Sequence, residues 1–324
     1  MLVWCLDDGS LLQALETLEV GLIAAGTPEE LLHHLPYADG VIMSAAQLTD
    51  ALKGALRKSA PGLRWLHLLN AGFDTVKAGD FGREVKVTYS PGAGATTVAE
   101  HGLALMLALA RGLPQALAEQ RRGRWDYGLG RGLTSLRGRT ALIFGFGHVG
   151  TALAQLLSPF GMRVIAVSRH GGDKAGVEAS CPMEDAERHL PECDHIVVAA
   201  PLTDETRGYF DAARLGRFKP GAFLTNLSRG AIVDLEALGS ALEAGRLAGA
   251  ALDVTDPEPL PQDHPIWSAP NLLVTPHIAA AGANRHDRAE LIRIALENCR
   301  RFAEGEPLLH VVDLSQGIVV RGEA

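Results

Sequence analysis

Residues 140–157 read TALIFGFGHVGTALAQLL, in which a strand-like apolar run meets a glycine-rich turn and then a helix-like stretch. The turn has the spacing GxGxxG, which is a weak signal unless, as here, a strand precedes it and a helix follows it. The first glycine permits a tight turn, the second lets the backbone approach a pyrophosphate, and the third allows close packing of helix on strand. The helix N-terminus adds N–H groups and the positive end of a dipole. The stretch therefore predicts a dinucleotide-binding βαβ unit whose cofactor contacts are Gly145, Phe146, Gly147, His148, Val149 and Gly150.

Short strand-like runs alternate with longer helix-like stretches along the rest of the chain, which is typical of parallel sheets with crossover helices. The predicted strands of a first series are residues 2–6, 40–43, 63–69 and 85–88. Those of a second series are residues 140–144, 162–167, 195–200, 222–226, 250–254 and 272–275. Between the two series one helical stretch is predicted over 96–122, apolar on nearly all sides at 102–110 as in a helix buried between domains. A last helix, over 283–302, is expected to pack back on the first domain.

These patterns predict an α/β protein with two doubly wound parallel-sheet domains and a cleft between them. We expect a discontinuous, flavodoxin-like substrate domain formed by residues 1–96 and 282–324. Residues 97–281 are expected to form a Rossmann domain that binds the cofactor. The length of 324 residues suits two such domains, each with a hydrophobic core of its own.

Composition narrows the classes of partner. The formal net charge of −8 argues against a nucleic-acid partner, because phosphate binding requires clustered Lys and Arg. The cysteines form no CxxC pair, which disfavours a metal site and a disulfide framework; they are Cys5, Cys181, Cys193 and Cys299. No apolar stretch is long enough to span a bilayer, and no basic region precedes the short apolar run at the N-terminus. We expect a cytoplasmic globular protein with no membrane partner.

The end of the strand predicted over 162–167 bears on which dinucleotide is bound. A carboxylate there would accept hydrogen bonds from a ribose 2′-hydroxyl, but the chain continues with Ser168, Arg169 and His170. A hydroxyl followed by a guanidinium suits a 2′-phosphate, which arginine can bind bidentately. We predict that Ser168 and Arg169 contact the cofactor and that NADP(H) is preferred, with NAD(H) as a possible cofactor. The alternative is that Arg169 stacks on the adenine or points to solvent.

Three polar residues follow later strands, at the ends where a doubly wound sheet binds its ligand. Arg229 comes after 222–226, Glu258 after 250–254 and His277 after 272–275. Arginine can bind a carboxylate and polarise a neighbouring carbonyl, and histidine can pass a proton to the carbonyl oxygen. A glutamate beside the histidine stabilises the imidazolium. Each of the three alone would more often be structural, but together they predict a catalytic set.

The chain resembles the D-isomer-specific 2-hydroxyacid dehydrogenase family, and within it the NADPH-dependent glyoxylate/hydroxypyruvate reductases. The resemblance covers nearly the whole length and is specific because several motifs occur in the right order. Besides the glycine-rich turn, these are 70–74 (NAGFD), 97–101 (TVAEH), 201–203 (PLT), 226–233 (NLSRGAIV), 252–260 (LDVTDPEPL) and 275–280 (TPHIAA).

The resemblance implies roles for individual residues. Arg229 would bind the carboxylate and carbonyl of the substrate, His277 would be the acid and base, and Glu258 would be its partner. The implied substrate-binding residues are Asn70, Ala71, Gly72, Arg229 and His277. Further implied cofactor contacts are Pro201, Thr206, Leu227, Ser228 and Asp253, the last near the nicotinamide carboxamide. Glu100 and His101 have no proton-transfer role in the family pattern and are interpreted as structural, as is His67 inside its apolar strand.

We therefore expect an oxidoreductase that transfers a hydride between NAD(P)H and a small 2-oxoacid or D-2-hydroxyacid, in particular a glyoxylate/hydroxypyruvate reductase. Glu258 stands where related formate dehydrogenases carry glutamine, which favours such a substrate. The resemblance also implies a homodimer formed through 97–122 and the loop after it. Two alternatives stay open. One is an NADH-dependent dehydrogenase of another D-2-hydroxyacid, and the other is a non-enzymatic dinucleotide-sensing protein like the related corepressors, which the intact catalytic set disfavours.

Overall fold

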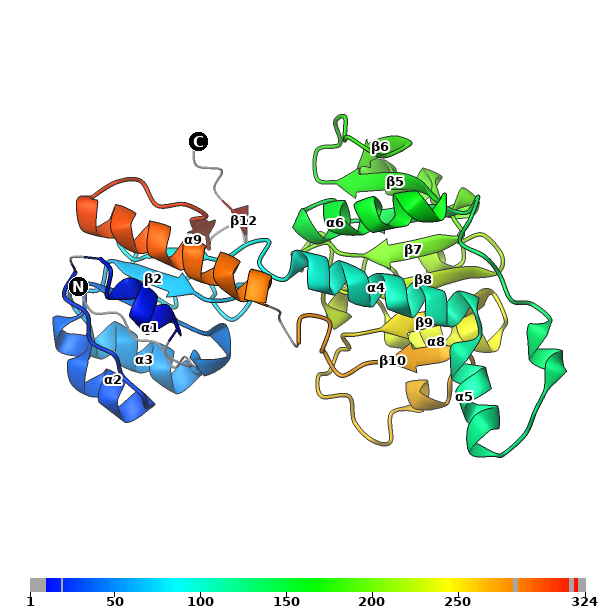
Figure 1. Cartoon of the computed structure of the whole chain (residues 1–324), viewed down its shortest axis with the longest axis horizontal. Helices are drawn as coiled ribbons and strands as arrows, with labels where there is room; N and C mark the ends of the chain where they lie inside the picture. Colours follow the sequence, from blue (N-terminus) through cyan, green and yellow to red (C-terminus); the bar gives the residue numbers. More distant parts are fainter. Residues whose placement is uncertain (1–9, 19, 282–284, 315–317, 320–324) are drawn as a thin grey trace. The chain divides into compact units, whose positions relative to one another are not determined.

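The computed structural model describes residues 10–18, 20–281, 285–314 and 318–319. The chain forms two compact units, residues 1–94 with 283–324 and residues 95–282. The predicted divisions, after 96 and after 281, lie within two residues of these. Each unit is a parallel sheet flanked by helices, so the chain has the predicted two-domain α/β architecture (Figure 1).

The second unit, described throughout from residue 95 to 281, contains a seven-stranded sheet. Its strands are β4 (Thr140–Phe144), β5 (Arg163–Ser168), β6 (Ala179–Pro182), β7 (His195–Val198), β8 (Ala222–Asn226), β9 (Leu247–Leu252) and β10 (Leu272–Val274). All neighbours run parallel, in the order β10-β9-β8-β7-β4-β5-β6. The chain thus winds outward from β4 in one direction and from β7 in the other, which creates a topological switch point between β4 and β7.

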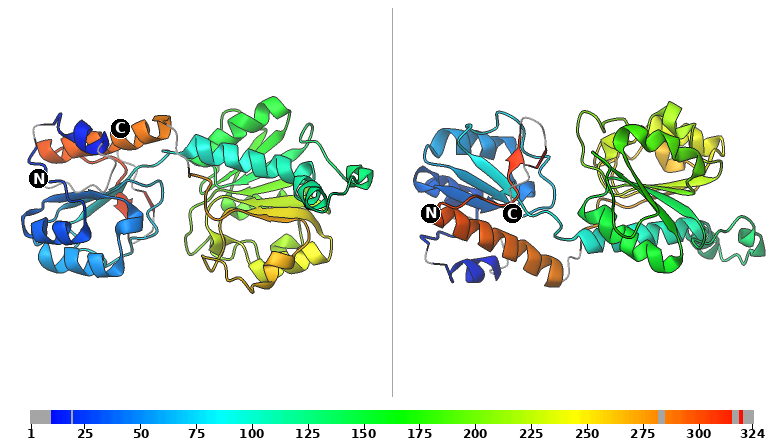
Figure 2. Two further views of the ribbon diagram at one scale, coloured as in Figure 1. Left: turned by 60° about the horizontal axis from the view of Figure 1, so that its bottom comes forward. Right: turned by 90° about the horizontal axis from the view of Figure 1, so that it is seen from above.

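Helices cover both faces of this sheet (Figure 2). They are α4 (Ala95–Ala110), α5 (Leu113–Arg121), α6 (His148–Leu157), α7 (Ala212–Leu215) and α8 (Leu235–Glu243), with 3₁₀ turns η3 (Tyr127–Gly130), η4 (Ser158–Phe160), η5 (Met183–Arg188), η6 (Leu190–Glu192), η7 (Gly230–Ile232) and η8 (Pro265–Ser268). Alternate strand residues point to opposite faces. Leu142 and Phe144 belong to the same buried cluster as Leu238 of α8, whereas Ile143 belongs to the cluster that contains Leu153 of α6 and Leu105 of α4. Both faces of β4 are buried, which explains its unbroken apolar run.

The structure of this unit differs from the prediction at two places. Strand β6 was not predicted, because the residues Ala179–Pro182 are small and carry no β-branched side chain; pairing with β5 at the sheet edge forms this strand. The helix predicted over 96–122 is two helices, since Gly112 adopts φ 60° in the left-handed region and separates α4 from α5. The other predicted strands of the unit are confirmed, with ends shifted by at most three residues.

In the first unit, three described strands, β1 (Gly40–Met43), β2 (Trp65–Leu68) and β3 (Lys86–Tyr89), form a parallel sheet in that order. Helices α2 (Pro28–His34) and α3 (Asp50–Ser59) share a core with one face, and α1 (Ser10–Leu15) and α9 (Arg285–Glu304) with the other. Further elements are η1 (Leu35–Tyr37), η2 (Ala45–Gln47), β11 (Val312–Asp313) and β12 (Ile318–Val319). The prediction that the last helix packs back on the first domain is confirmed. The strand predicted over 2–6 lies outside the described residues.

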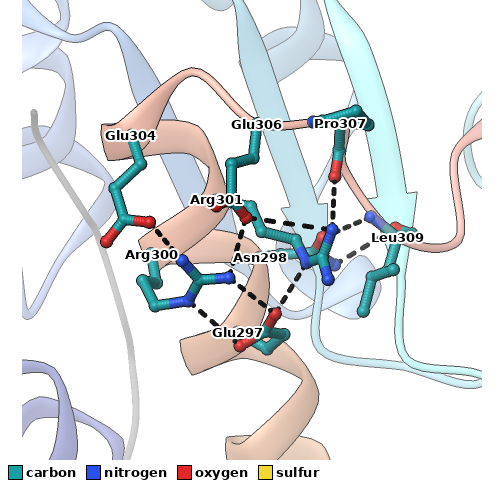
Figure 3. Close-up of polar contacts among 8 residues, drawn as sticks. All are labelled: Glu297, Asn298, Arg300, Arg301, Glu304, Glu306, Pro307 and Leu309. Carbon is teal, nitrogen blue, oxygen red and sulfur yellow. Dashed lines mark hydrogen bonds and ion pairs between the residues drawn. The ribbon is translucent and has the colours of Figure 1, made fainter.

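Polar contacts hold the turn that follows α9 (Figure 3). Asn298 is fully buried and uses both ends of its amide, since Nδ2 donates to the Leu309 carbonyl and Oδ1 accepts from the Leu309 N–H. Among half-buried side chains of the same turn, Arg300 and Arg301 both bind the Glu297 carboxylate. These contacts direct residues 307–313 back toward β3, where Val311 forms a bridge with Thr88.

His67 has the structural place expected of it. Its ring is fully buried, with Nδ1 2.8 Å from Thr88 Oγ1 and Nε2 3.1 Å from Ser90 Oγ. Burial, with a smaller contribution from His310, lowers the pKa of His67 to about 3. The side chain is therefore a neutral hydrogen-bonding member of the core. None of the helices described in the structure has the length and apolar character needed to cross a membrane.

Candidate active site

The glycine-rich turn lies at the switch point, where the carboxyl ends of β4 and β7 meet. A Cβ atom on Gly145 would lie 2.2 Å from the Ala200 backbone nitrogen, and φ of Gly145 is 106°. A Cβ atom on Gly150 would lie 2.4 Å from the Gly145 carbonyl oxygen. Only glycine therefore suits these two positions. Their tight packing brings α6 close to the end of β4.

Gly147, the N-cap of α6, has a different surrounding. No described atom beyond its chain neighbours lies within 4 Å of the place where its Cβ would be. A pocket of about 420 Å³ opens beside it, lined by residues that include Thr96, Gly147, His148 and Thr151. The first-turn N–H groups of a helix have no intrahelical partner. The turn thus combines open space with backbone donors, as a pyrophosphate group requires.

The residues at the end of β5 and directly after it include an accessible cationic side chain. The Ser168 hydroxyl donates to the Gly171 carbonyl oxygen at 3.1 Å and shapes the turn. Arg169 and His170 are exposed. Within the described part of the chain, Arg169 makes no hydrogen bond or ion pair. Its guanidinium is therefore not committed to another side chain of the described protein.

Other predicted cofactor contacts have structural partners. Thr206 is buried, and its hydroxyl donates to the Pro201 carbonyl oxygen at 2.7 Å. The hydroxyl of Ser228 donates to the Ala200 carbonyl oxygen. Leu227 is buried in the core that α4 shares with the sheet. These side chains shape the loops after β7 and β8, and their contact with a dinucleotide stays a prediction.

Asn226 positions the loop that carries Arg229. This fully buried amide donates from Nδ2 to the Arg229 carbonyl oxygen at 3.0 Å and accepts from the Ser228 N–H at 3.1 Å. The half-buried Arg229 guanidinium donates from Nη1 to the Ser228 carbonyl oxygen at 2.7 Å. A Cβ atom on Gly230 would lie 1.9 Å from the backbone of Thr255, so this position needs glycine. No role was predicted for Asn226 or Gly230.

Glu258 and His277 are brought together from the loops after β9 and β10. His277 Nδ1 lies 2.5 Å from Glu258 Oε1, and their side chains are 50% and 40% exposed. A carboxylate only accepts, so Nδ1 donates and the second ring nitrogen, Nε2, is left for a reacting group. His277 also has φ 54°, a left-handed conformation that costs a non-glycine residue about 1–3 kcal/mol.

Asp253 holds the backbone on both sides of that strained residue. Its carboxylate is 1% exposed and accepts the N–H groups of Ile278 at 3.0 Å and Ala279 at 2.9 Å. Its carbonyl oxygen accepts the His277 N–H at 2.8 Å. These bonds offset the cost of the left-handed conformation. The predicted contact of Asp253 with the nicotinamide stays a prediction, but the structure gives the residue a definite role beneath the His277 turn.

His101 was interpreted only as a structural member of its helix, and the structure places it against the site. Its Nε2 lies 3.1 Å from Thr275 Oγ1 and 3.5 Å from Asp253 Oδ1. One signal was available in the sequence. His101 precedes the buried Leu105 by four residues, which puts both side chains on the sheet-facing side of α4. That spacing gives the direction of the ring but not its partner.

Asn70, Ala71 and Gly72 belong to the first unit, in the loop that follows β2. The Asn70 side chain accepts the Ala45 N–H at 2.6 Å, and its carbonyl oxygen accepts the Ser90 N–H at 3.0 Å. These bonds fix the shape of the 70–72 loop, and its part in substrate binding stays a prediction. Within the described residues, no group of three or more His, Cys, Asp or Glu side chains is placed to bind a metal ion.

Comparison with curated proteins gives relatives over most of the chain. Glyoxylate reductase of Aeropyrum pernix is 37% identical over 267 residues, which cover 80% of this chain and 79% of that protein. D-3-phosphoglycerate dehydrogenase of Archaeoglobus fulgidus is 32% identical over 302 residues, 92% of this chain but 55% of that protein. An uncharacterised protein of Corynebacterium melassecola is 40% identical over 179 residues, which cover 55% of this chain and 58% of that protein. The chain thus spans little more than half the length of the last two relatives.

Several solved structures have the same fold as this protein over nearly the whole chain. A D-isomer specific 2-hydroxyacid dehydrogenase family protein from Aeromonas salmonicida has a TM-score of 0.83 at 30% identity, covering 97% of this chain and 98% of that one. A D-isomer specific 2-hydroxyacid dehydrogenase from Xanthobacter autotrophicus, solved in complex with NADPH and MES, has a TM-score of 0.80 at 31% identity, covering 98% and 99%. The family model "D-isomer specific 2-hydroxyacid dehydrogenase, NAD binding domain" matches residues 103–279. With more than half of its length matched by this model, the chain belongs to the D-isomer-specific 2-hydroxyacid dehydrogenases, a family of oxidoreductases.

Proposed function

We propose that this protein reduces a small 2-oxoacid, with glyoxylate and hydroxypyruvate as the first candidates and NADPH as the hydride donor. The observation that carries the proposal is the hydrogen bond between His277 and Glu258, made in loops at the same sheet edge as the glycine-rich turn. A proton donor beside a dinucleotide site is what reduction of a carbonyl requires. Relatives named glyoxylate reductase, at 32% to 37% identity, support this substrate class.

The residues of the turn suit a dinucleotide. Gly145 and Gly150 allow α6 to pack close to the end of β4, and Gly147 leaves open space beside the turn. The first turn of α6 offers N–H donors to the pyrophosphate. When bound there, NADPH supplies a hydride to the carbonyl carbon of the 2-oxoacid.

Residues of the protein transfer the proton and bind the charged substrate. In the acid form His277 carries a proton on each ring nitrogen, and Glu258 holds the one on Nδ1. His277 donates the Nε2 proton to the carbonyl oxygen, which becomes the hydroxyl, and remains as a neutral imidazole bound to Glu258. Arg229 binds the substrate carboxylate and polarises the neighbouring carbonyl. In the reverse direction the same imidazole takes the proton from the hydroxyl.

The function is tested with a panel of 2-oxoacids, assayed with NADPH and with NADH by the absorbance of the reduced nicotinamide. We expect reduction of glyoxylate or hydroxypyruvate with NADPH. Activity confined to another 2-oxoacid would change the substrate assignment. No reduction of any acid, combined with a cofactor-dependent change in oligomeric state, would instead favour a dinucleotide-sensing interaction protein.

The preference for NADPH gives a separate prediction. The Arg169 side chain is exposed and has no ion pair or hydrogen bond within the part of the chain that the structure describes. Because a hydrogen bond to a charged group contributes about 1.5–3 kcal/mol, Arg169→Ala should lower the ratio of kcat/KM for NADPH to that for NADH by roughly 10–100-fold. Steady-state kinetics with each cofactor measures this ratio, and the NADH values of the variant are the internal control. An unchanged ratio would remove Arg169 from cofactor recognition.

We also propose that the protein is a homodimer that uses α5 and the loop after it. Leu113 and Leu117 on α5 are 49% and 52% exposed, and Trp125 and Tyr127 in the loop are each 86% exposed. Large apolar side chains exposed together favour a protein interface. Analytical ultracentrifugation of the wild type should give the mass of two chains. The double variant Leu117→Glu/Trp125→Glu should give the mass of one chain. A dimer that persists in the double variant would place the interface elsewhere.

A further inference from the structure

A polar chain beneath the His277 turn takes no part in the proposed reaction. It begins at His101 on α4 and passes through Thr275, which follows β10, to the buried carboxylate of Asp253. His101 Nε2 lies 3.1 Å from Thr275 Oγ1 and 3.5 Å from Asp253 Oδ1. Thr275 Oγ1 lies 2.6 Å from the same Asp253 Oδ1. All of these residues lie in the second unit.

The direction of the hydrogen bonds follows from the protons available. A carboxylate only accepts, so the single hydroxyl proton of Thr275 goes to Asp253. Thr275 Oγ1 then has only lone pairs to offer His101, and the His101 Nε2 must carry a proton and donate it to this bond. The hydrogen bonds therefore run from His101 to Thr275 and from Thr275 to Asp253. The bond to Thr275 sets the tautomer of the His101 ring.

The carboxylate at the end of this chain holds the backbone around His277. It accepts the N–H groups of Ile278 and Ala279, while the Asp253 carbonyl oxygen accepts the His277 N–H. These bonds surround a residue at φ 54°, a conformation that persists only where neighbouring contacts impose it. A shift of the carboxylate therefore moves the imidazole relative to Glu258 and to the substrate.

We propose that His101 is a positioning residue for the proton transfer. By donating to Thr275, it orients the hydroxyl that fixes the Asp253 carboxylate, and the carboxylate fixes His277. The proposal rests on the proposed function, because it gives His277 the role of proton donor. His101 itself passes no proton to the substrate.

The first experiment needs no substrate. Amide hydrogen exchange of residues 277–279 is compared in the wild type, in His101→Leu and in Glu100→Gln, a matched control because Glu100 is the exposed neighbour on the same helix. His101→Leu loses the hydrogen bond from His101 to Thr275. This loss should speed exchange of the Ile278 and Ala279 amides by about three- to tenfold, whereas exchange in the control should not change. Unchanged exchange would overturn the proposal, whatever the protein's activity.

The second experiment uses the enzyme with glyoxylate and NADPH. His101→Leu and Thr275→Val should each lower kcat by about 10–100-fold, since small misplacements of a reacting group have effects of this size. The KM for glyoxylate and the Kd for NADPH should stay within about threefold, because the lost interaction acts in the transition state. Thr275→Ser keeps the hydroxyl and should recover most of the loss. Wild-type kcat in His101→Leu, or no recovery in Thr275→Ser, would overturn the proposal.

The pH dependence separates positioning from proton donation. In His101→Leu the acid-base limb of the kcat profile should persist, because His277 still donates the proton. If that limb disappears, His101 is itself the donor and the positioning role is wrong. If the wild type reduces no 2-oxoacid, the proposed function fails while the amide-exchange result still decides the role of His101.

Discussion

Asparagine in place of His277 is expected to lower kcat for 2-oxoacid reduction by roughly 10²–10⁴-fold, the usual contribution of a general acid. Asparagine is the substitution to use because position 277 has φ 54°, and asparagine adopts the left-handed region more readily than glutamine. The turn held by Asp253 should therefore survive while the proton donor is lost. Steady-state kinetics gives kcat, and calorimetric titration with NADPH should show binding close to that of the wild type.

Glu258→Gln is the companion variant. The amide can still accept the His277 Nδ1 proton, so the orientation of the ring is kept while the negative charge is lost. Since hydrogen bonds to a charged group contribute about 1.5–3 kcal/mol, a loss of roughly 10–100-fold in kcat is expected, less than for His277→Asn. Turnover at the wild-type rate in His277→Asn would remove the histidine from the reaction.

Removal of the Arg229 guanidinium should have the second large effect. Arg229→Ala is expected to lower kcat/KM for glyoxylate by roughly 10²–10³-fold, the scale found for loss of one donor that stabilises a reacting oxygen. Both carboxylate binding and carbonyl polarisation depend on this side chain in the proposed mechanism. Initial rates across a range of glyoxylate concentrations measure the loss, and an unchanged kcat/KM would contradict the assignment.

Arg229→Lys tests whether geometry or charge matters. Lysine keeps the positive charge but cannot present two parallel N–H donors to a carboxylate. It should therefore recover only part of the activity lost in Arg229→Ala. Because Arg229 also donates to the Ser228 carbonyl oxygen, the melting temperature and the NADPH affinity of both variants are the controls for an intact loop.

The strands could be predicted where burial on both faces leaves an unbroken apolar run. Leu142, Ile143 and Phe144 in β4 are such a run, and the strand has the predicted bounds. Strand β6 could not be found this way, since Ala179–Pro182 is an edge segment whose conformation comes from pairing with β5. The break after α4 was also missed, because Gly112 looks like a tolerable glycine in a helix until its left-handed φ is known.

The candidate site, like the fold, could be predicted from the sequence only in part. Glycine spacing and the polar residues after strands were enough to nominate Gly147, Arg229 and His277, because these positions lie at strand ends that parallel topology brings to one edge. The hydrogen bonds of Asp253 and His101 could not be predicted from spacing. They join residues 101, 253 and 275, whose separation in the chain carries no information about side-chain direction.

By itself, the sequence determined the family and the parallel-sheet architecture and predicted the residue types of the reaction, since local runs, turns and strand ends carry these patterns directly. Only the tertiary structure decided which polar side chains support the others. Thr206 and Ser228 hold the backbone of their loops, Asp253 holds the turn that presents His277, and His101 contacts Thr275 beside the Asp253 carboxylate. The physical reason is that hydrogen bonds over a few ångströms depend on exact direction and burial, which are fixed only when distant segments pack together.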